Sequence, residues 1–279
     1  MAVRLPSGAS HVFWRASRAP LQWTAADVDL AALVTWHPGR SGVAWATLPI
    51  SGSGEAHALT LVIARIDPQA LSFQLVWDIA HDRPHWTVDR ATDAALAVNA
   101  GMFVDRLPWG WVVVDGHERL PPGYGPLSSA LVGLADGRLV WVDGDDVSAW
   151  RRRGNVRFAF QSYPTLLAGD GAVPAALRNG AINVTHRDAR LALGLDRQGR
   201  LLVVLTRLDL PIPGADRVPF GLTVPEMAAV MGALGAQRAM LLDGGISAQL
   251  TVADAGGQAR AWKGLRKVPL ALVARAGPE

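Results

Sequence analysis

Apolar residues recur along most of the chain in short runs or in alternation, which is the pattern of β-strands. The run LTLVIARI at 59–66 predicts a buried strand, residues 67–70 carry turn chemistry, and LSFQLVW at 71–77 alternates like a second strand. We expect these two strands to form a hairpin. Further strands are predicted at 110–114, 130–134, 138–142 and 156–160, with a tight turn at 135–137.

The clearest hairpin lies in the second half of the chain. RLALGL at 190–195 and RLLVVLT at 200–206 flank the turn residues 196–199, and the continuous apolar run in the second strand suits a central strand covered on both faces. AMLLD at 239–243 predicts another buried strand. LTVA and VPLALVARA, further along, are expected to close the sheet.

Two helices are predicted. Thr223 and Glu226 have the spacing of a capping box, apolar residues follow at i, i+3, i+4 and i+7 from Met227, and Gly235 is placed to end the helix. Thr87 is expected to cap a shorter helix that runs toward Asn99. Together these elements predict an α+β fold with a mixed, mostly antiparallel central sheet and a few packed helices.

The first part of the chain has no sustained period of two or of 3.6. Residues 1–40 contain Trp14, Trp23 and Trp36 among scattered prolines and serines, so we expect an irregular extension that packs its tryptophans on the main body. Residues 41–279 are expected to form one domain, whose size suffices for a single large core.

Composition excludes several classes of protein. The chain has no cysteine, so disulfides, thiolate nucleophiles and cysteine-ligated zinc are absent. No apolar run approaches the ~18 residues of a membrane span, and the first residues lack the apolar stretch of a signal peptide. His81 and His85 have Pro84 between them and no glutamate in the place that zinc-protease chemistry requires. Nucleophile-elbow, P-loop and dinucleotide-binding motifs are also missing from the sequence.

The charge balance does not indicate a nucleic-acid partner. Lys and Arg number 27 against 24 Asp and Glu, a formal net charge of only +3. Lys263 and Lys267 are the only lysines, and the basic run at 151–153 is interpreted as a solvated loop because no nucleic-acid motif accompanies it.

One strand end stands out as a candidate site. Asp243 ends a buried strand and is followed by Gly244 and Gly245, so a carboxylate would lie at the sheet edge beside accessible backbone. Asn99 and Ser247 lie on loops expected at the same end of the sheet. A turn-capping role is the alternative for Asp243.

Four further segments of the sequence are NAGMF at 99–103, QSYPTLLAGDG at 161–171, RLALGLDRQGRLLVV at 190–204, and GLTVPEMAAVMGALG leading into AMLLDGGISAQL at 221–250. Taken in order, these four segments resemble the phosphodiester glycosidase family, which includes the lysosomal uncovering enzyme and bacterial proteins linked to exopolysaccharides. The resemblance spans roughly residues 60 to 275. Ala100, Leu191 and Ile246 depart from the glycine, threonine and third glycine that are usual in the family.

The resemblance implies a hydrolase that cleaves a sugar–phosphodiester bond in a glycan or a phosphate-containing polysaccharide, in the periplasm or secreted. It requires no cofactor and no protein metal ligand, although a divalent cation is compatible with it. Asp243, Glu226 and Asp105 are then the catalytic candidates, with Asp115 and Asp188 as weaker alternatives to Asp105. The expected substrate contacts are Asn99, Gly101, Gln161, Tyr163, Arg190, Gly244, Gly245 and Ser247.

Several of these residues have a structural alternative. Because a phosphodiester is already a good leaving group, a cation that holds the phosphate matters more than a strong acid, and Arg190 with the glycine amides would suit that role. Arg190 could equally pair with Asp188 or a neighbouring strand, and the capping box alone accounts for Glu226. The alternative function is a noncatalytic protein that binds glycans or assists exopolysaccharide assembly on the same scaffold, for which the 11 tryptophans would supply stacking surfaces.

Overall fold

The computed structural model describes residues 1–4, 8–14, 29–51, 58–125, 127–169, 171–178 and 182–277. Its strands form one nine-stranded sheet, two five-stranded sheets and two small hairpins, and every pairing among the described strands is antiparallel. The expected α+β class with mostly antiparallel sheets is confirmed. Among the described residues, no helix is long and apolar enough to cross a membrane.

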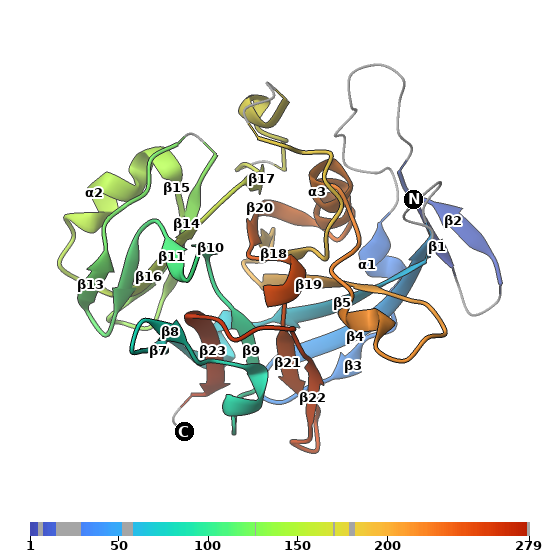
Figure 1. Ribbon diagram of the computed structural model, residues 1–279, viewed down its shortest axis with the longest axis horizontal. Coiled ribbons are helices and arrows are strands. Elements are labelled where there is room, and N and C mark those ends of the chain that lie inside the picture. Colours follow the sequence, from blue (N-terminus) through green and yellow to red (C-terminus); the bar gives the residue numbers. More distant parts are fainter. Residues whose placement is uncertain are drawn as a thin grey trace.

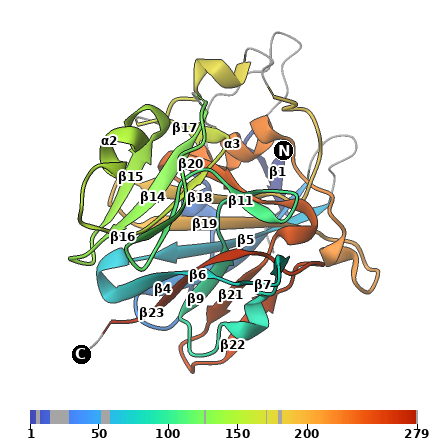
Figure 2. The same ribbon diagram turned by 60° about the vertical axis from the view of Figure 1, so that its left-hand side comes forward.

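The nine-stranded sheet has the order β17-β20-β18-β19-β5-β4-β1-β2, with β3 paired to β4, and Figure 2 shows its central strands lying side by side. Its strands are β1 (Ala2–Arg4), β2 (Ser10–Val12), β3 (His37–Pro38), β4 (Val43–Ser51), β5 (Leu59–Ile66), β17 (Thr165–Leu167), β18 (Leu191–Asp196), β19 (Leu201–Leu208) and β20 (Ala236–Leu242).

The two five-stranded sheets have the orders β13-β12-β16-β14-β15 and β22-β21-β9-β23-β6. Figure 1 shows the first of them, together with α2, on the side of the molecule opposite the chain's N-terminus. Their strands are β6 (Leu71–Trp77), β9 (Leu96–Asn99), β12 (Val112–Val114), β13 (His117–Leu120), β14 (Ser129–Leu134), β15 (Leu139–Asp143), β16 (Val156–Ser162), β21 (Leu250–Ala253), β22 (Ala259–Trp262) and β23 (Leu270–Ala276).

Two hairpins stand apart from the sheets, β7 (Ile79–Ala80) with β8 (Arg83–Pro84), and β10 (Met102–Val104) with β11 (Leu107–Trp109). The helices are α1 (Leu30–Leu33), α2 (Val147–Arg151) and α3 (Val224–Ala233), and the 3₁₀ turns are η1 (Pro68–Ala70), η2 (Val88–Arg90), η3 (Gly144–Asp146), η4 (Ala175–Arg178), η5 (Ala215–Arg217) and η6 (Gly245–Ser247).

The nine-stranded sheet is the middle layer because both of its faces are apolar. On β5, Leu61 and Ile63 point into the core shared with α3, whereas Val62 and Ala64 point into the core shared with the two five-stranded sheets. This follows from the alternation of side chains along a strand. The continuous apolar runs of β5 and β19 therefore mark strands buried on both faces, as expected for the second of them.

The expected hairpin of 59–66 and 71–77 is wrong. The strand β5 pairs with β4 and β19, and β6 pairs with β23 in a different sheet. The turn η1 between them, capped by the Asp67 side chain, carries the chain from one layer to the other. Since β5 is buried on both faces and β6 on one, the two patterns belong to different layers.

The expected helix from Thr87 toward Asn99 is also wrong. Only the turn η2 forms there, Thr87 makes no side-chain cap, and Gln249 Oε1 accepts the hydrogen bond of the Val88 N–H instead. Asp93 has a φ of 61°, which ends any helix, and Leu96–Asn99 join a sheet as β9. Pairing with β21 and β23 outweighs the local helix propensity of the alanines.

The remaining predicted strands and the second helix form as expected, except that β21 and β23 lie in a five-stranded sheet and do not close the sheet of β20. The pairs β18–β19 and β14–β15 form the expected hairpins, and α3 begins with the capping box of Thr223 and Glu226 and is followed by Gly235 at φ 89°. The segment 1–40 was expected to be irregular, but its described residues contain regular structure, since β1 and β3 both pair with β4. Trp14 and Trp36 pack half-buried against the α3 core. Trp23 and Asp170 lie outside the described residues.

Candidate active site at the end of β20

Asp243 follows β20 and is fixed through its backbone. Its N–H donates to the carbonyl oxygen of Gly101 at 2.8 Å, and Asn99 Nδ2 donates to its carbonyl oxygen at 2.9 Å. Asn99 is fully buried at the end of β9, and its Oδ1 accepts from the Gln249 N–H at 3.0 Å. The side chain of Asn99 is therefore engaged at both ends, and it positions Asp243 without facing a substrate.

The side chain of Asp243 joins a chain of hydrogen bonds with Ser247 and Arg266. Arg266 Nη2 lies 3.1 Å from Asp243 Oδ2, and Arg266 Nε donates to Ser247 Oγ at 2.6 Å. Burial raises the pKa of Asp243 above its ordinary value, although the Ser247 hydroxyl, the Arg266 charge and the Phe103 N–H oppose that rise. A fixed carboxylate whose pKa lies closer to neutrality is suited to acid–base or nucleophilic chemistry.

The two glycines after Asp243 permit close packing against residues 188–190. A Cβ on Gly244 would lie 2.4 Å from the Ala189 carbonyl oxygen. A Cβ on Gly245, which has a φ of 56°, would lie 3.0 Å from both carboxylate oxygens of Asp188. The Gly245 N–H donates to Ala189 at 2.7 Å, so this amide is not available to hold a phosphate, contrary to our expectation.

The same packing brings a second carboxylate to the site. Asp188 is half-buried beside Gly245, and burial raises the pKa of its carboxyl group, opposed by the charge of Arg190. Asp105, the stronger candidate from sequence, is exposed in the turn of the β10–β11 hairpin, and Asp115 lies in the turn between β12 and β13. The structure thus places Asp188 closer to the glycine turn of Asp243 than the sequence indicated.

Arg266 lies on a loop that is tied to the turn η6. Its backbone N–H donates to the Ile246 carbonyl oxygen at 3.1 Å. Buried Arg207 on β19 donates through Nη2 to the carbonyl oxygens of Ala248, Trp262 and Lys263 at 2.8–3.1 Å. Burial lowers the pKa of Arg207 to about 10. The guanidinium of Arg207 therefore holds the loop of Arg266 against the segment that carries Ser247.

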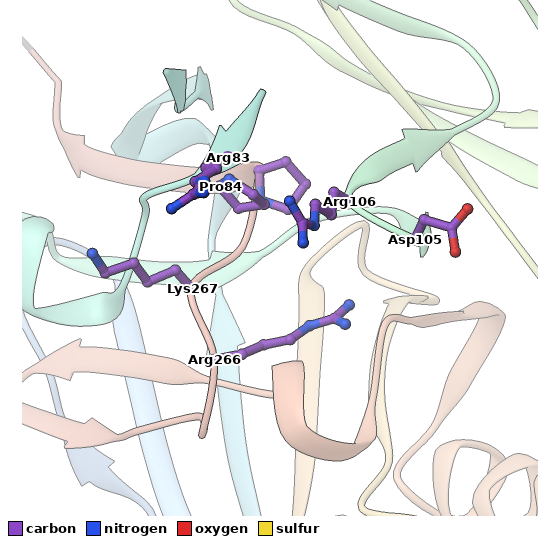
Figure 3. Close-up of a pocket in the computed structure, with 7 residues that line it drawn as sticks. Arg83, Pro84, Asp105, Arg106, Arg266 and Lys267 are labelled. Atoms are coloured by element: carbon purple, nitrogen blue, oxygen red, sulfur yellow. The ribbon is translucent and has the colours of Figure 1, made fainter. Parts of the chain in front are cut away.

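Arg266 also lines a pocket of about 470 Å³, so the pocket adjoins Asp243. Figure 3 shows Arg106 and Arg266 reaching from different segments toward the same space, with Arg83 and Lys267 on the side away from Asp105. The β7–β8 hairpin, the β10–β11 hairpin and residues 266–269 form its walls. Its lining residues are Arg83, Pro84, Asp105, Arg106, Arg266, Lys267 and Pro269, which are four cationic side chains and one carboxylate.

Arg190 comes near the same turn but is differently engaged. Its Nε donates to the Leu222 carbonyl oxygen at 2.8 Å, and its Nη2 donates to the His186 carbonyl oxygen. Burial lowers the pKa of Arg190, opposed by Asp188 and Glu226. Asn99, Arg190, Asp243 and Ser247 thus converge as expected, but these contacts of Arg190 favour the structural interpretation over a phosphate clamp.

Glu226 is accounted for by structural contacts. Its Oε2 accepts the Thr223 N–H at 2.8 Å, and both of its oxygens accept from the guanidinium of Arg187 at 2.7 and 3.1 Å. Its side chain is only 8% exposed. These contacts support the capping role that the sequence left open and leave Glu226 little surface for a substrate.

Gln161 and Tyr163 were expected to contact sugar, and they have different surroundings. Gln161 is 1% exposed; its Oε1 accepts from the N–H groups of Trp111 and Gly123, and its Nε2 donates to Ser128. This side chain organises the loops, and its burial contradicts the expectation of a sugar contact. Tyr163 is half-buried and packs edge-on against Trp109 of β11, with ring centroids 4.6 Å apart.

The cationic side chains of the pocket were missed in the sequence. One signal was present: the only two lysines of the chain flank Leu265 and Arg266 in the stretch KGLRK at 263–267. Arg83 and Arg106 carry no comparable signal, since arginine is common throughout this chain. Among the described residues, no group of three or more His, Asp or Glu side chains could hold a metal ion.

The fold and the site define a sheet-based domain in which a half-buried carboxylate adjoins a cationic pocket. The sequence profile of the phosphodiester glycosidase family matches residues 92–275, more than half of the chain. The chain therefore belongs to the phosphodiester glycosidase family. No curated protein matches the sequence.

Two solved structures are similar in fold. The catalytic domain of zebrafish N-acetylglucosamine-1-phosphodiester alpha-N-acetylglucosaminidase, auto-inhibited by its pro-peptide, has a TM-score of 0.66 at 17% identity and covers 88% of each chain. A hypothetical protein from Synechocystis has a TM-score of 0.54 at 18% identity, covering 85% of this chain and 62% of that chain. At these identities the likeness shows the fold alone.

Proposed function

We propose that this chain hydrolyses the bond between a sugar and a phosphodiester in a glycan or a phosphate-containing polysaccharide. The observation that carries the proposal is the position of Arg266, which contacts the half-buried carboxylate of Asp243 and lines the cationic pocket at the same time. A sugar phosphodiester has a reacting carbon and an anionic group one atom apart. Membership of the phosphodiester glycosidase family supports this assignment.

In the proposed reaction Asp243 acts at the anomeric carbon. The bond from that carbon to the bridging oxygen breaks, the oxygen of water takes its place on the carbon, and the phosphate leaves as a monoester. Arg266 and the other cations of the pocket stabilise the negative charge that the leaving phosphate gains. Asp188, whose carboxylate lies beside Gly245, is the candidate second carboxylate of the reaction.

The stereochemistry of the product assigns the role of Asp243. If its carboxylate attacks the carbon, the first product keeps the anomeric configuration, and if it activates water, the configuration is inverted. Proton NMR of a reaction in progress shows the anomeric configuration of the first product directly.

The proposal requires no divalent cation, because arginine and lysine supply the positive charge. Turnover is therefore expected to survive dialysis against a chelator.

The alternative of a noncatalytic glycan-binding protein predicts a different surface. The residues lining the pocket include no tryptophan, and four of the seven are cationic. Trp109 lies on the hairpin that also carries Arg106, and with Tyr163, which packs against it, it forms the candidate surface for stacking a sugar ring. We therefore favour an enzyme in which this aromatic pair orients the substrate.

A comparison of two substrates tests the proposal. The purified protein is offered a sugar-1-phosphodiester and the matched alkyl glycoside without phosphate, and released sugar is measured for the wild type and for Asp243→Asn. We expect release only from the phosphodiester and only with the wild type. Equal activity of the two proteins would remove Asp243 from the mechanism, and activity on neither substrate would favour the binding function.

A periplasmic or secreted location is part of the same proposal and rests on the family resemblance. Fractionation of cells that express the full-length protein tests it. Recovery of the protein in the cytoplasmic fraction alone would contradict this part of the proposal.

A further inference from the structure

The pocket beside Asp243 has more positive charge than a phosphodiester can neutralise. Its lining side chains are Arg83, Arg106, Arg266 and Lys267 against the single carboxylate of Asp105. Arg266 is paired with Asp243, whereas no carboxylate of the described residues lies within ion-pair distance of the other three cations. With Asp105 counted against those three, two positive charges are left, and a phosphodiester has only one negative charge.

The missing charge is supplied by the reaction. When the bond from the sugar to the bridging oxygen breaks, the phosphate keeps both bonding electrons, so the monoanionic diester becomes a dianionic monoester. The two negative charges of this product equal the two charges that remain in the pocket. The pocket is therefore matched in charge to the product, and to the transition state in which this charge develops.

We propose that this pocket is a binding site for phosphate monoesters in their dianionic form. The inference rests on the proposed function, which explains why the pocket would have this charge. It concerns binding alone, so it can be tested without measuring turnover. Free phosphate monoesters bind there more tightly than diesters of similar size and act as competitive inhibitors. Arg83, Arg106 and Lys267, the three cations that have no carboxylate partner among the described residues, set this preference.

Exposure of these three side chains sets the expected size of the effect. All three are exposed, so water screens each contact and no single one dominates. Together they are expected to give the monoester an affinity about tenfold higher than that of the diester at low ionic strength. This preference should decrease as salt is added.

The probes are methyl phosphate and dimethyl phosphate, titrated into the wild-type protein by calorimetry at pH 8 and pH 5. The second ionisation of a phosphate monoester lies near pH 6, so methyl phosphate is a dianion at pH 8 and a monoanion at pH 5. We expect about tenfold tighter binding of methyl phosphate at pH 8 and similar affinities at pH 5. Equal affinities at pH 8 would overturn the inference.

Two protein groups near the pocket, Asp243 and His85, carry ionisable side chains, and their effects on probe binding can be separated. Ionisation of Asp243 changes the affinity for methyl phosphate and for dimethyl phosphate in the same direction. Its effect therefore largely cancels in the ratio of the two affinities. His85 lies beside the rim, with Nδ1 2.8 Å from the Arg83 carbonyl oxygen. A His85→Gln variant should keep the pH dependence of the ratio, and loss of that dependence would assign it to the histidine and contradict the inference.

Charge-removing variants locate the site. The double variant Arg106→Gln, Lys267→Gln should lose the preference for methyl phosphate at pH 8, while Arg138→Gln should keep it because Arg138 is paired with Asp136 in a turn outside the pocket. If the double variant still prefers methyl phosphate at pH 8, the pocket is not the site that sets the preference, and the inference is wrong. Hydrolysis without the preference refutes this inference alone, and the preference without hydrolysis refutes only the proposed function.

Discussion

Two arginines lie near the glycine turn of Asp243, and they differ in what their donors do. Arg190 is half-buried, and its Nε and Nη2 donate to the backbone carbonyl oxygens of residues 222 and 186. Arg266 is 37% exposed, contacts Ser247 and Asp243, and lines the pocket. An arginine whose donors are engaged by the backbone holds the fold, whereas one that shares its donors with a carboxylate at a pocket can meet a substrate.

The largest effect should come from the carboxylate that Arg266 contacts. Asp243→Asn is expected to lower kcat by about a hundredfold to ten-thousandfold, because an amide can neither attack nor take a proton. The measurement is single-turnover release of sugar, with thermal unfolding as the check of folding. If Asp243→Asn is folded and still active, Asp243 is not the reacting group, and the contrast between Arg190 and Arg266 has no bearing on catalysis.

The next effect concerns Arg266 itself. Arg266→Lys keeps the charge but loses the fork that reaches Ser247 and Asp243 together, at a cost of about 1.5–3 kcal/mol per charge-assisted hydrogen bond. We expect kcat/KM to fall by about tenfold to a hundredfold. An unchanged kcat/KM with a lowered Tm would mean that Arg266, like Arg190, only stabilises the fold, and it would contradict the difference drawn between the two arginines.

For Arg190 the opposite result is expected. Arg190→Lys should lose one or both contacts to the carbonyl oxygens of Leu222 and His186, at about 1–3 kcal/mol, which corresponds to a decrease in Tm of about 2–10 °C. The value of kcat/KM should change by less than about threefold, because its engaged donors do not meet substrate. A large kinetic loss at unchanged Tm would revive the phosphate clamp that the sequence suggested.

Glu226→Gln should also lower stability without lowering activity, by a smaller amount than Arg190→Lys. The amide oxygen can still accept from the Thr223 N–H, but the charge opposite Arg187 is lost, at about 1–2 kcal/mol of unfolding free energy. We expect a lower Tm and an unchanged kcat/KM. Loss of activity in a folded variant would instead make Glu226 a site residue.

The pH dependence of stability should be the smallest effect. Because burial raises the pKa of Asp243 in the folded protein, the folded state binds more protons than the unfolded state between the ordinary aspartate pKa and the raised one. Ionised Asp243 therefore destabilises the fold, and its contribution becomes less favourable as pH rises through this window.

The variant Asp243→Asn isolates that contribution. The difference in Tm between Asp243→Asn and the wild type should increase in favour of the variant as pH rises through the window. Activity of the wild type should rise over the same window, because the ionised carboxylate reacts. A Tm difference that is independent of pH would contradict the raised pKa.

The sequence predicted those parts of the fold in which local and tertiary preferences agree. The β18–β19 hairpin and the capped helix α3 carry strong local signals, and the strand that ends at Asp243 follows from its apolar run. The pairing of β5 and β6 could not be predicted, because two apolar strands joined by a turn look alike whether they share a sheet or not. Layer assignment depends on contacts with distant segments.

The site was predicted around the strand end of Asp243 and missed on the loop that carries Arg266. Asp243 follows from its strand, and Asn99 and Ser247 were expected on loops beside it, although Asn99 ends β9 and proves to be a positioning residue. Arg266 is brought to Asp243 by hydrogen bonds to Ile246 and by the buried guanidinium of Arg207. Those contacts join segments that no local pattern relates to each other, so the sequence favoured Arg190 instead.

The most direct test of the central claim is to identify which bond water enters. The wild-type protein hydrolyses a sugar-1-phosphodiester in water labelled with heavy oxygen, and mass spectrometry locates the label in the products. Attack at the anomeric carbon, as the geometry around Asp243 and Arg266 predicts, places the label on the sugar and leaves the phosphate monoester unlabelled. Label in the phosphate monoester would mean that water attacks phosphorus, and it would contradict the account.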